Sequence, residues 1–252
     1  MASEKTDAIV IRMIEFSETS LVVTLYSREF GRVSAIAKGA RRPKGPFEGA
    51  IDLLSICQVE IFRKSGDALD LLAEAKLVRR FRAAQRSLER LYCGYYVAEM
   101  LRRWTDDGDP HPDFYDLAVA AIERIDGAGD HLMAVTHFEV RAMRLLGHAP
   151  ATKTCVACGA EVSRSPQRIA FGHEAGGVLC STCQPRQRGV AMVHRTVLDW
   201  VDRLNESESA PAEPFSNESY RQIRALLNRY IRISLGSRPR TQSMLPTKVT
   251  AH

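Results

Sequence analysis

The segment Cys155-Val156-Ala157-Cys158-Gly159 and its counterpart Cys180-Ser181-Thr182-Cys183 are two Cys-x-x-Cys motifs, about twenty residues apart. Two residues between paired cysteines let the backbone fold back so that both sulfurs converge, and two such corners make a tetrahedral thiolate cage suited to one Zn²⁺. Gly159 follows the first motif, where a positive φ turns backbone N–H groups toward the sulfurs. Four thiolates leave no position for a reacting water, so the expected zinc is structural, with Cys155, Cys158, Cys180 and Cys183 as its ligands.

The segment between the two motifs reads as a small ribbon. Arg168–Phe171 and Gly177–Leu179 are expected as short strands around a glycine-bounded turn that contains His173. We therefore predict a zinc ribbon over residues 152–188. Two disulfides or four unrelated thiols are the alternatives, and His173 is an alternative ligand or the ligand of a second metal.

The composition of the whole chain is that of a globular protein of the reducing cytoplasm. It has 252 residues, 45% of them hydrophobic, and no apolar run of membrane-spanning length. Met1–Thr6 lacks the apolar core of a signal peptide, so a cytoplasmic protein without a membrane partner is expected. Six cysteines, four of them in the motifs, suit a reducing compartment. A net charge of +5 and a pI near 9.0 permit a polyanionic partner without requiring one.

The first part of the chain alternates between apolar and polar residues as strands do. Five short strands between Asp7 and Leu77 predict a small barrel of the OB type. Gly31 follows Ser27–Phe30, where a hairpin turn is needed. The apolar positions expected to share a face within each strand are Ile9, Ile11 and Met13; Leu21, Val23 and Leu25; Val33, Ala35 and Ala37; Cys57, Val59 and Ile61; and Leu69 and Leu71.

The connection Lys38–Phe47 stands out within this barrel. Glycines and prolines keep it out of regular structure, and four cations without a carboxylate among them repel one another unless an anion lies between them. OB folds bind single strands across a strand face and its flanking loops, so we predict a nucleic-acid contact here. An ordinary solvated loop is the alternative. Phe47 is expected to anchor the loop to the core. The cations predicted to contact nucleic acid are Lys38, Arg41, Arg42 and Lys44.

After residue 78 the apolar period becomes that of helices. Helices are expected over about 79–104, 112–124, 131–146, 193–204 and 217–235. The first is expected to bury Phe81, Ala84 and Leu88 and to carry a stripe of Arg79, Arg82, Arg86 and Arg90 opposite. That stripe is either a solvated face or a set of phosphate contacts, and we include Arg82 and Arg86 among the candidate DNA-binding residues.

Together these features predict an α+β multidomain chain. An N-terminal OB-fold β-barrel (1–78) precedes an α-helical domain (79–252), which the four-cysteine zinc ribbon (152–188) interrupts.

The order of these parts resembles the RecO family of bacterial recombination mediators and DNA repair proteins along almost the whole chain. The segments that carry the resemblance are Asp7–Val10, Tyr26–Gly31, Ala37–Arg42, Leu145–Pro150 and the helix end at Leu235-Gly236. Lys38, Arg41 and Arg42 match the family's basic Lys-Gly-x-Arg-Arg pattern, and the resemblance gives them its DNA-contact role. The four motif cysteines match the zinc-bearing members.

The resemblance also implies an activity and partners. It implies binding of single- and double-stranded DNA, annealing of complementary strands, and loading of recombinase on DNA coated by single-strand-binding protein (SSB), together with RecR. Partners would be ssDNA, dsDNA, RecR and the C-terminal tail of SSB, and the protein would act in the cytoplasm at the nucleoid. Thr241 stands where family members often have Ser.

Other functional classes find less support. His111, His131, His137 and His148 have no recognisable catalytic companion, and no Walker-type phosphate loop is present, so we expect no enzyme activity. An RNA-binding OB and zinc-ribbon protein is the stronger alternative, because groove charge and base stacking do not distinguish RNA from DNA. A pure assembly adaptor is a third reading.

Overall fold

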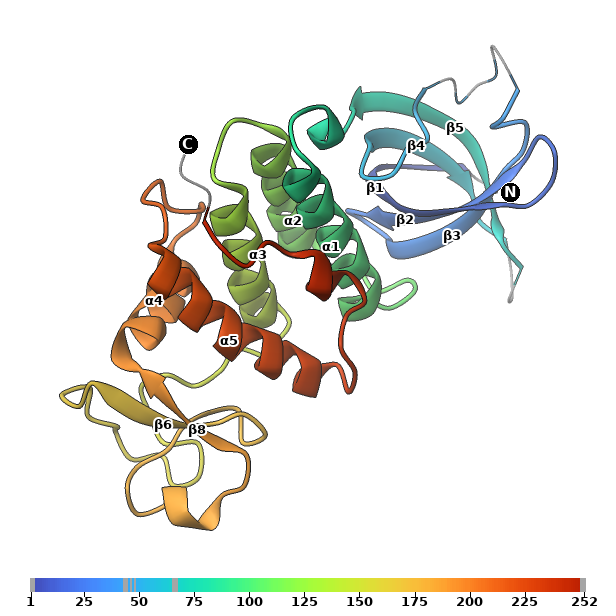
Figure 1. Ribbon diagram of the computed structural model, residues 1–252. Coiled ribbons are helices and arrows are strands. Elements are labelled where there is room, and N and C mark those ends of the chain that lie inside the picture. The colour runs from blue at the N-terminus through green and yellow to red at the C-terminus, as the bar shows by residue number, and fades with distance from the viewer. Residues whose placement is uncertain (1–2, 43–44, 46, 48, 65–67, 250–252) are drawn as a thin grey trace. The chain divides into compact units, whose positions relative to one another are not determined.

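The computed structural model describes residues 3–42, 45, 47, 49–64 and 68–249 (Figure 1). The chain folds as two compact units, residues 1–128 and 129–252. These units divide the chain after its second long helix, whereas the predicted domain limits follow the change from strands to helices; those limits stay predictions. None of the helices in the described part of the chain combines the length and hydrophobicity needed to cross a membrane.

Unit 1 begins with a closed five-stranded barrel in the order β1-β2-β3-β5-β4, in which only the β3–β5 pairing is parallel. The long first strand pairs with β4 through its first half and with β2 through its second, and a bulge between Val10 and Arg12 bends it between the two. This closure confirms the OB-type prediction. The strands are β1 Ser3–Glu15, β2 Leu21–Ser27, β3 Gly31–Ala37, β4 Ile56–Phe62 and β5 Asp70–Arg79.

Alternating side chains from all five strands fill the barrel, as the period of two predicts. The faces predicted for β3 and β4 are confirmed, and Phe47 is buried in the same core. Two strands differ. In β1 the bulge shifts the register, so that Ala8 and Val10 face the core while Ile9 and Ile11 are buried outside this cluster. In β5 the core positions are Leu72 and Ala75, and Leu69 is exposed.

Two helices complete unit 1, α1 Leu88–Trp104 and α2 Pro112–Asp126. The prediction that a helix starts near Arg79 was wrong, because β5 runs to Arg79 and a 3₁₀ turn, η1 Ala83–Gln85, follows. Helix α1 begins only after Ser87, whose Oγ accepts a hydrogen bond from the Arg90 N–H. Ala84 and Leu88 are exposed, and the buried side of α1 is instead formed by Cys93, Tyr96, Val97, Met100 and Leu101.

In its described residues, 129–249, unit 2 contains three helices, a ribbon sheet and two 3₁₀ turns. The helices are α3 His131–Leu145, α4 Arg195–Glu206 and α5 Asn217–Ser234. Arg224 of α5 is buried and forms an ion pair with Glu139 of α3, Nη2 to Oε1 3.0 Å. The 3₁₀ turns are η2 Gln184–Arg186 and η3 Thr241–Met244.

The ribbon sheet has the order β7-β6-β8, with β6 Arg168–Gly172, β7 Gly177–Val178 and β8 Val190–His194. The first two strands confirm the predicted ribbon. Strand β8 corrects the predicted helix around residue 193: Val193 pairs with Ile169, and the His194 side chain caps α4 by accepting from the Thr196 N–H. One short strand therefore leads directly into a helix.

Candidate metal centre and candidate nucleic-acid interface

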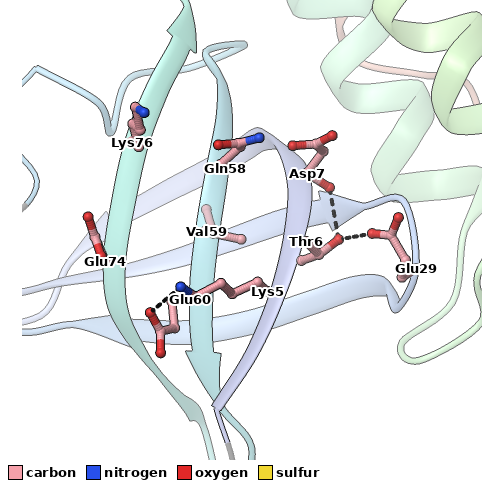
Figure 2. Close-up of a pocket in the computed structure, with 9 residues that line it drawn as sticks. All are labelled: Lys5, Thr6, Asp7, Glu29, Gln58, Val59, Glu60, Glu74 and Lys76. Carbon is pink, nitrogen blue, oxygen red and sulfur yellow. Dashed lines mark hydrogen bonds and ion pairs between the residues drawn. The ribbon is translucent and has the colours of Figure 1, made fainter.

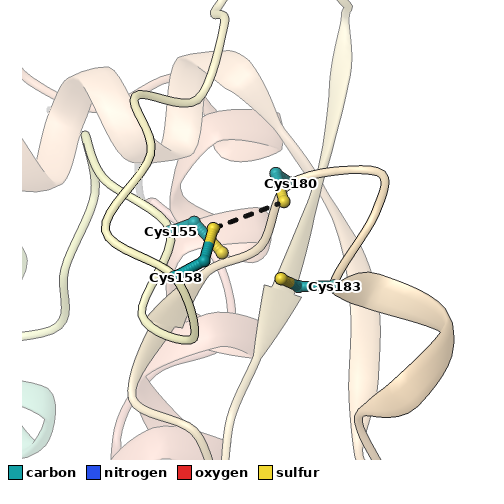
Figure 3. Close-up of side chains that lie close together, drawn as sticks. All are labelled: Cys155, Cys158, Cys180 and Cys183. Atoms are coloured by element: carbon teal, nitrogen blue, oxygen red, sulfur yellow. Dashed lines mark hydrogen bonds between the residues drawn. The ribbon is translucent and has the colours of Figure 1, made fainter.

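The four motif cysteines lie together at one end of the ribbon, two from each Cys-x-x-Cys turn (Figure 3). Each turn closes by a backbone hydrogen bond, from the Gly159 N–H to the Cys155 carbonyl (2.8 Å) and from the Gln184 N–H to the Cys180 carbonyl (2.9 Å). Gly159 has a φ of +75°, as expected. The second turn reaches a similar closure by continuing into η2.

The sulfur positions fit a tetrahedral metal. All four Sγ atoms lie within 4.8 Å of one another, and those of Cys158 and Cys180 are 3.8 Å apart. Metal–sulfur bonds of about 2.3 Å in a tetrahedron place sulfurs roughly 3.8 Å apart, whereas a disulfide needs about 2.05 Å. All six cysteines are free. The four motif cysteines can therefore hold a metal ion, and among the described residues His173 is not part of their cluster.

The electrostatics of the cluster also favour a cation. Hydrogen bonds from backbone N–H groups, the Cys180 N–H first, lower the pKa of Cys155 to about 6. In contrast, hydrogen bonds to neighbouring sulfurs, first those of Cys180 and Cys158, raise the pKa of Cys183 to about 12, because they favour its protonated form. A divalent cation at the centre would favour the thiolate form of all four cysteines.

Three of the four metal-site cysteines belong to or pack on the ribbon's own small apolar cluster. Its buried cluster consists of Cys155, Ala170 and Leu179, with Cys180 and Cys183 among the partly buried residues packed against it. The metal ligands are thus also part of the ribbon core, which is typical of a structural site.

At the barrel, the basic loop extends from the end of β3 (Lys38 onward). Lys38, Arg41 and Arg42 are exposed, while Lys44 lies outside the described residues. The Arg42 N–H donates to the Gly39 carbonyl (3.0 Å), and Gly39 has a φ of +76°. The structure thus brings three of the four predicted loop cations together on one turn.

The β1–β2 turn supports this loop, which the sequence did not indicate. The Arg41 N–H donates to the Thr19 carbonyl (3.1 Å), and Arg41 Nη1 lies 3.2 Å from Oε2 of Glu15. A carboxylate therefore does lie beside the loop cations, although none is present within the loop sequence. Because this pair is exposed on both sides, it is weak and can exchange for another anion.

Arg82 and Arg86 do not lie on a helical stripe. They flank η1, both with exposed side chains, and the Arg82 N–H donates to Asp126 Oδ1 (2.6 Å). Arg79 ends β5, and Arg90 is buried with Nη1 donating to the Ile125 carbonyl (2.9 Å). The prediction that these four arginines form a stripe along one helix is therefore wrong. DNA contact by Arg82 and Arg86 stays a prediction.

A different face of the barrel is acidic (Figure 2). A hollow of about 400 Å³ across β1, β4 and β5 is lined by four carboxylates and two ammonium groups, among other residues. Lys5 is paired with Glu60 there, Nζ to Oε2 3.6 Å. We call this surface the acidic hollow; its charged residues are Lys5, Asp7, Glu29, Glu60, Glu74 and Lys76. Its net negative charge disfavours a phosphate backbone.

Unit 2 contains a groove between β8 and α5 that the sequence reading also missed. Arg168, Arg229, His173 and His194 line it, and its apolar surface includes Met192 and Leu226. His173 is buried, and this burial, followed by the charge of Arg229, lowers its pKa. We call this the ribbon groove. Its cations come from segments far apart in sequence, so only the fold brings them together.

Comparison with known proteins identifies the family. The family model described as "Recombination protein O N terminal" matches residues 1–81, and "Recombination protein O C terminal" matches residues 85–243. A DNA repair protein RecO of Rhodopirellula baltica is 45% identical, over 96% of this chain and 98% of its own length. Relatives with the same name from Anaeromyxobacter dehalogenans and Symbiobacterium thermophilum are 34% and 29% identical over 93% and 98% of this chain, and 92% and 98% of their own lengths. The chain with this OB barrel, helical unit and four-cysteine ribbon belongs to the RecO family of DNA repair proteins.

Proposed function

We propose that this protein is a recombination mediator that binds ssDNA and dsDNA, anneals complementary strands and, with RecR, helps to load recombinase on SSB-coated DNA. The observation that carries the proposal is the exposed turn with Lys38, Arg41 and Arg42 at the rim of an OB barrel in a chain of this family. Such a turn suits backbone phosphates, which position a strand without reading its sequence.

We further propose that the cysteine cluster holds one structural Zn²⁺. Four thiolates at tetrahedral spacing are the ligand set of structural zinc, and they leave no coordination position for a substrate. The metal would stabilise the ribbon. No enzyme activity is proposed, in keeping with four sulfur ligands and the lack of a recognisable catalytic motif in the sequence. The proposed place of action is the cytoplasm, at the nucleoid.

The ribbon groove is our candidate for the SSB tail. The family resemblance implies a short acidic peptide with apolar terminal residues, and the groove combines Arg168 and Arg229 with the apolar Met192 and Leu226. The cations of the groove would pair with the carboxylates of the peptide, and the apolar residues of the peptide would pack against Met192 and Leu226. RecR is proposed as a partner on the resemblance alone.

A strand-annealing assay tests the proposal. Complementary oligonucleotides are mixed bare, coated with SSB, or coated with tailless SSB, each with and without the protein. We expect faster annealing on bare and SSB-coated strands and a clear loss with tailless SSB. No acceleration on bare strands would contradict the proposed mediator function, whereas equal activity with tailless SSB would contradict only the tail contact.

The alternative is that the basic loop binds RNA instead of DNA. Titrations with ssDNA and ssRNA of identical sequence separate the two readings, because a clear preference for RNA would overturn the assignment to DNA.

A further inference from the structure

Two exposed apolar side chains, Ile14 and Phe16, lie at the end of β1 and just beyond it. Arg12, Ile14 and Phe16 alternate along the chain and all are exposed, with 43% of Ile14 and 62% of Phe16 accessible. Single exposed apolar residues are common on proteins and need no explanation. Here, however, two exposed apolar residues, Ile14 and the aromatic Phe16, follow Arg12 beside a basic loop. This combination needs an explanation.

The position of Phe16 relative to the basic loop follows from strand register. Glu15 pairs with Leu21, and Leu21 pairs with Ala37, so the end of β1 and the start of the loop lie on the same rim of the barrel. Two contacts bridge the remaining gap, from the Arg41 N–H to the Thr19 carbonyl and between the Arg41 and Glu15 side chains. The backbone of Phe16 therefore lies on the same rim of the barrel as the turn that carries the loop cations.

The turn that carries Phe16 is held in place by hydrogen bonds. The N–H groups of Phe16 and Ser17 donate to the Ser20 carbonyl (3.1 and 3.2 Å), and the Ser20 N–H donates to Ser17 Oγ (3.2 Å). The backbone that carries the ring is thus ordered before a ligand binds, which lowers the entropic cost of binding. Phe47, the other aromatic of this region, is in the barrel core and cannot stack on a base.

We infer that Phe16 is a stacking platform for one base of a single strand whose phosphates contact Lys38, Arg41 and Arg42. This inference rests on the proposed DNA binding at the basic loop. Cations that track phosphates beside an aromatic ring are the general means of binding single strands without sequence preference. Ile14 extends the apolar surface under the same nucleotide. A duplex keeps its bases stacked inside, so Phe16 contributes to single strands and not to double strands.

The test compares Phe16→Ala with Val78→Ala. Val78 is equally exposed, at 61%, on the same barrel, but it lines a surface with Asp7, Asp116 and Glu123. Both variants and the wild type are titrated with oligo(dT), with an abasic oligonucleotide of the same length, and with a duplex, each across a salt series.

We expect Phe16→Ala to weaken oligo(dT) binding about fivefold or more, without changing the salt slope, because no phosphate contact is lost. Its effect should disappear with the abasic strand and the duplex, and Val78→Ala should match the wild type throughout. If Phe16→Ala binds oligo(dT) like the wild type, or weakens all three ligands equally, the inference is wrong.

Two further variants separate stacking from hydrophobic contact and from misfolding. Phe16→Leu should lose most of the affinity that Phe16→Ala loses, whereas Phe16→Trp should retain it and show fluorescence quenching by oligo(dT) but not by the abasic strand. Absence of that quenching would overturn the inference. If the wild type binds no strand at all, both the proposed function and this inference fail. If Phe16→Ala binds like the wild type while the salt slope of DNA binding still depends on Arg41 and Arg42, only this inference fails.

Discussion

The barrel and the ribbon relate their sites to their folds in opposite ways. In the barrel, a core drawn from all five strands stabilises the fold, while the candidate DNA contacts Lys38, Arg41 and Arg42 lie outside it in an exposed turn. In the ribbon, three of the four metal-site cysteines belong to or pack on the small buried cluster. The barrel separates its site from its fold, and the ribbon uses the same side chains for both.

This difference determines what each part tolerates. A loop on a self-sufficient core can change its charge without affecting stability, because surface substitutions usually cost less than about 0.5 kcal/mol. A ribbon whose ligands are its core cannot lose a ligand and keep its fold. The comparison can be broken or sharpened by changing each site in turn.

The largest effect is expected from Cys155→Ser. Removing one thiolate weakens the metal cage, and the cluster around Ala170 and Leu179 is too small to hold the ribbon by itself. The zinc content should fall from one ion per chain to much less, as metal analysis would show. Residues 152–188 should become sensitive to protease while the barrel fragment stays resistant.

The control for this change is Cys93→Ala, which removes a buried cysteine that is not one of the cluster's four. It should keep its zinc and its protease pattern. A protein purified without chelator that contains no zinc, or a Cys155→Ser ribbon as resistant as the wild type, would break the comparison from the ribbon side.

The next effect is on DNA affinity, with Arg41 and Arg42 both replaced by Ala. Losing two phosphate contacts on a single strand should flatten the log-log salt slope by about 1.4 and weaken binding to all sequences alike. Annealing should fall with it. Thermal unfolding should not change, because neither side chain is in the core.

The acidic hollow supplies a matched control. Lys5 and Lys76 are exposed cations of the same barrel, so replacing both by Ala makes the same change in net charge. That variant should keep the wild-type slope. An equal loss in both double variants would mean that net charge alone drives binding, and a drop in melting temperature for the arginine variant would break the comparison from the barrel side.

The local signals in the sequence predicted much of this molecule. Cys-x-x-Cys spacing and strand alternation are properties of neighbouring residues, so the cage and the barrel were predictable. The predicted start of α1 was too early because apolar residues recur at helical spacing through residues 79–87. The helix begins only after the Ser87 cap. Strand β8 was missed because Val190–His194 is short and pairs with β6, distant in sequence.

Contacts between distant segments account for the rest. The pairing of Glu15 with Arg41 joins residues on β1 and after β3, and no periodicity reports it. The ribbon groove likewise combines β6, β8 and α5. Sequence reasoning therefore found the cations of the loop but not the turn that supports them.

The smallest predicted effect concerns that supporting turn, through Glu15→Gln. Glu15 holds Arg41 in an exposed ion pair, and such pairs contribute about 0.2–1 kcal/mol. A phosphate must displace this carboxylate, so its removal should tighten ssDNA binding by about 1.4-fold to fivefold, the factor that this energy implies. Glu18→Gln is the control, because Glu18 is exposed in the same turn and makes the same change in charge. Only the excess of Glu15→Gln over Glu18→Gln reports the ion pair, and fluorescence anisotropy at fixed salt measures both.

Equal gains would show that the turn acts through its charge alone. A loss of affinity would show instead that Glu15 holds Arg41 in its binding position, and the barrel site would then depend on its scaffold more closely than the comparison with the ribbon assumes.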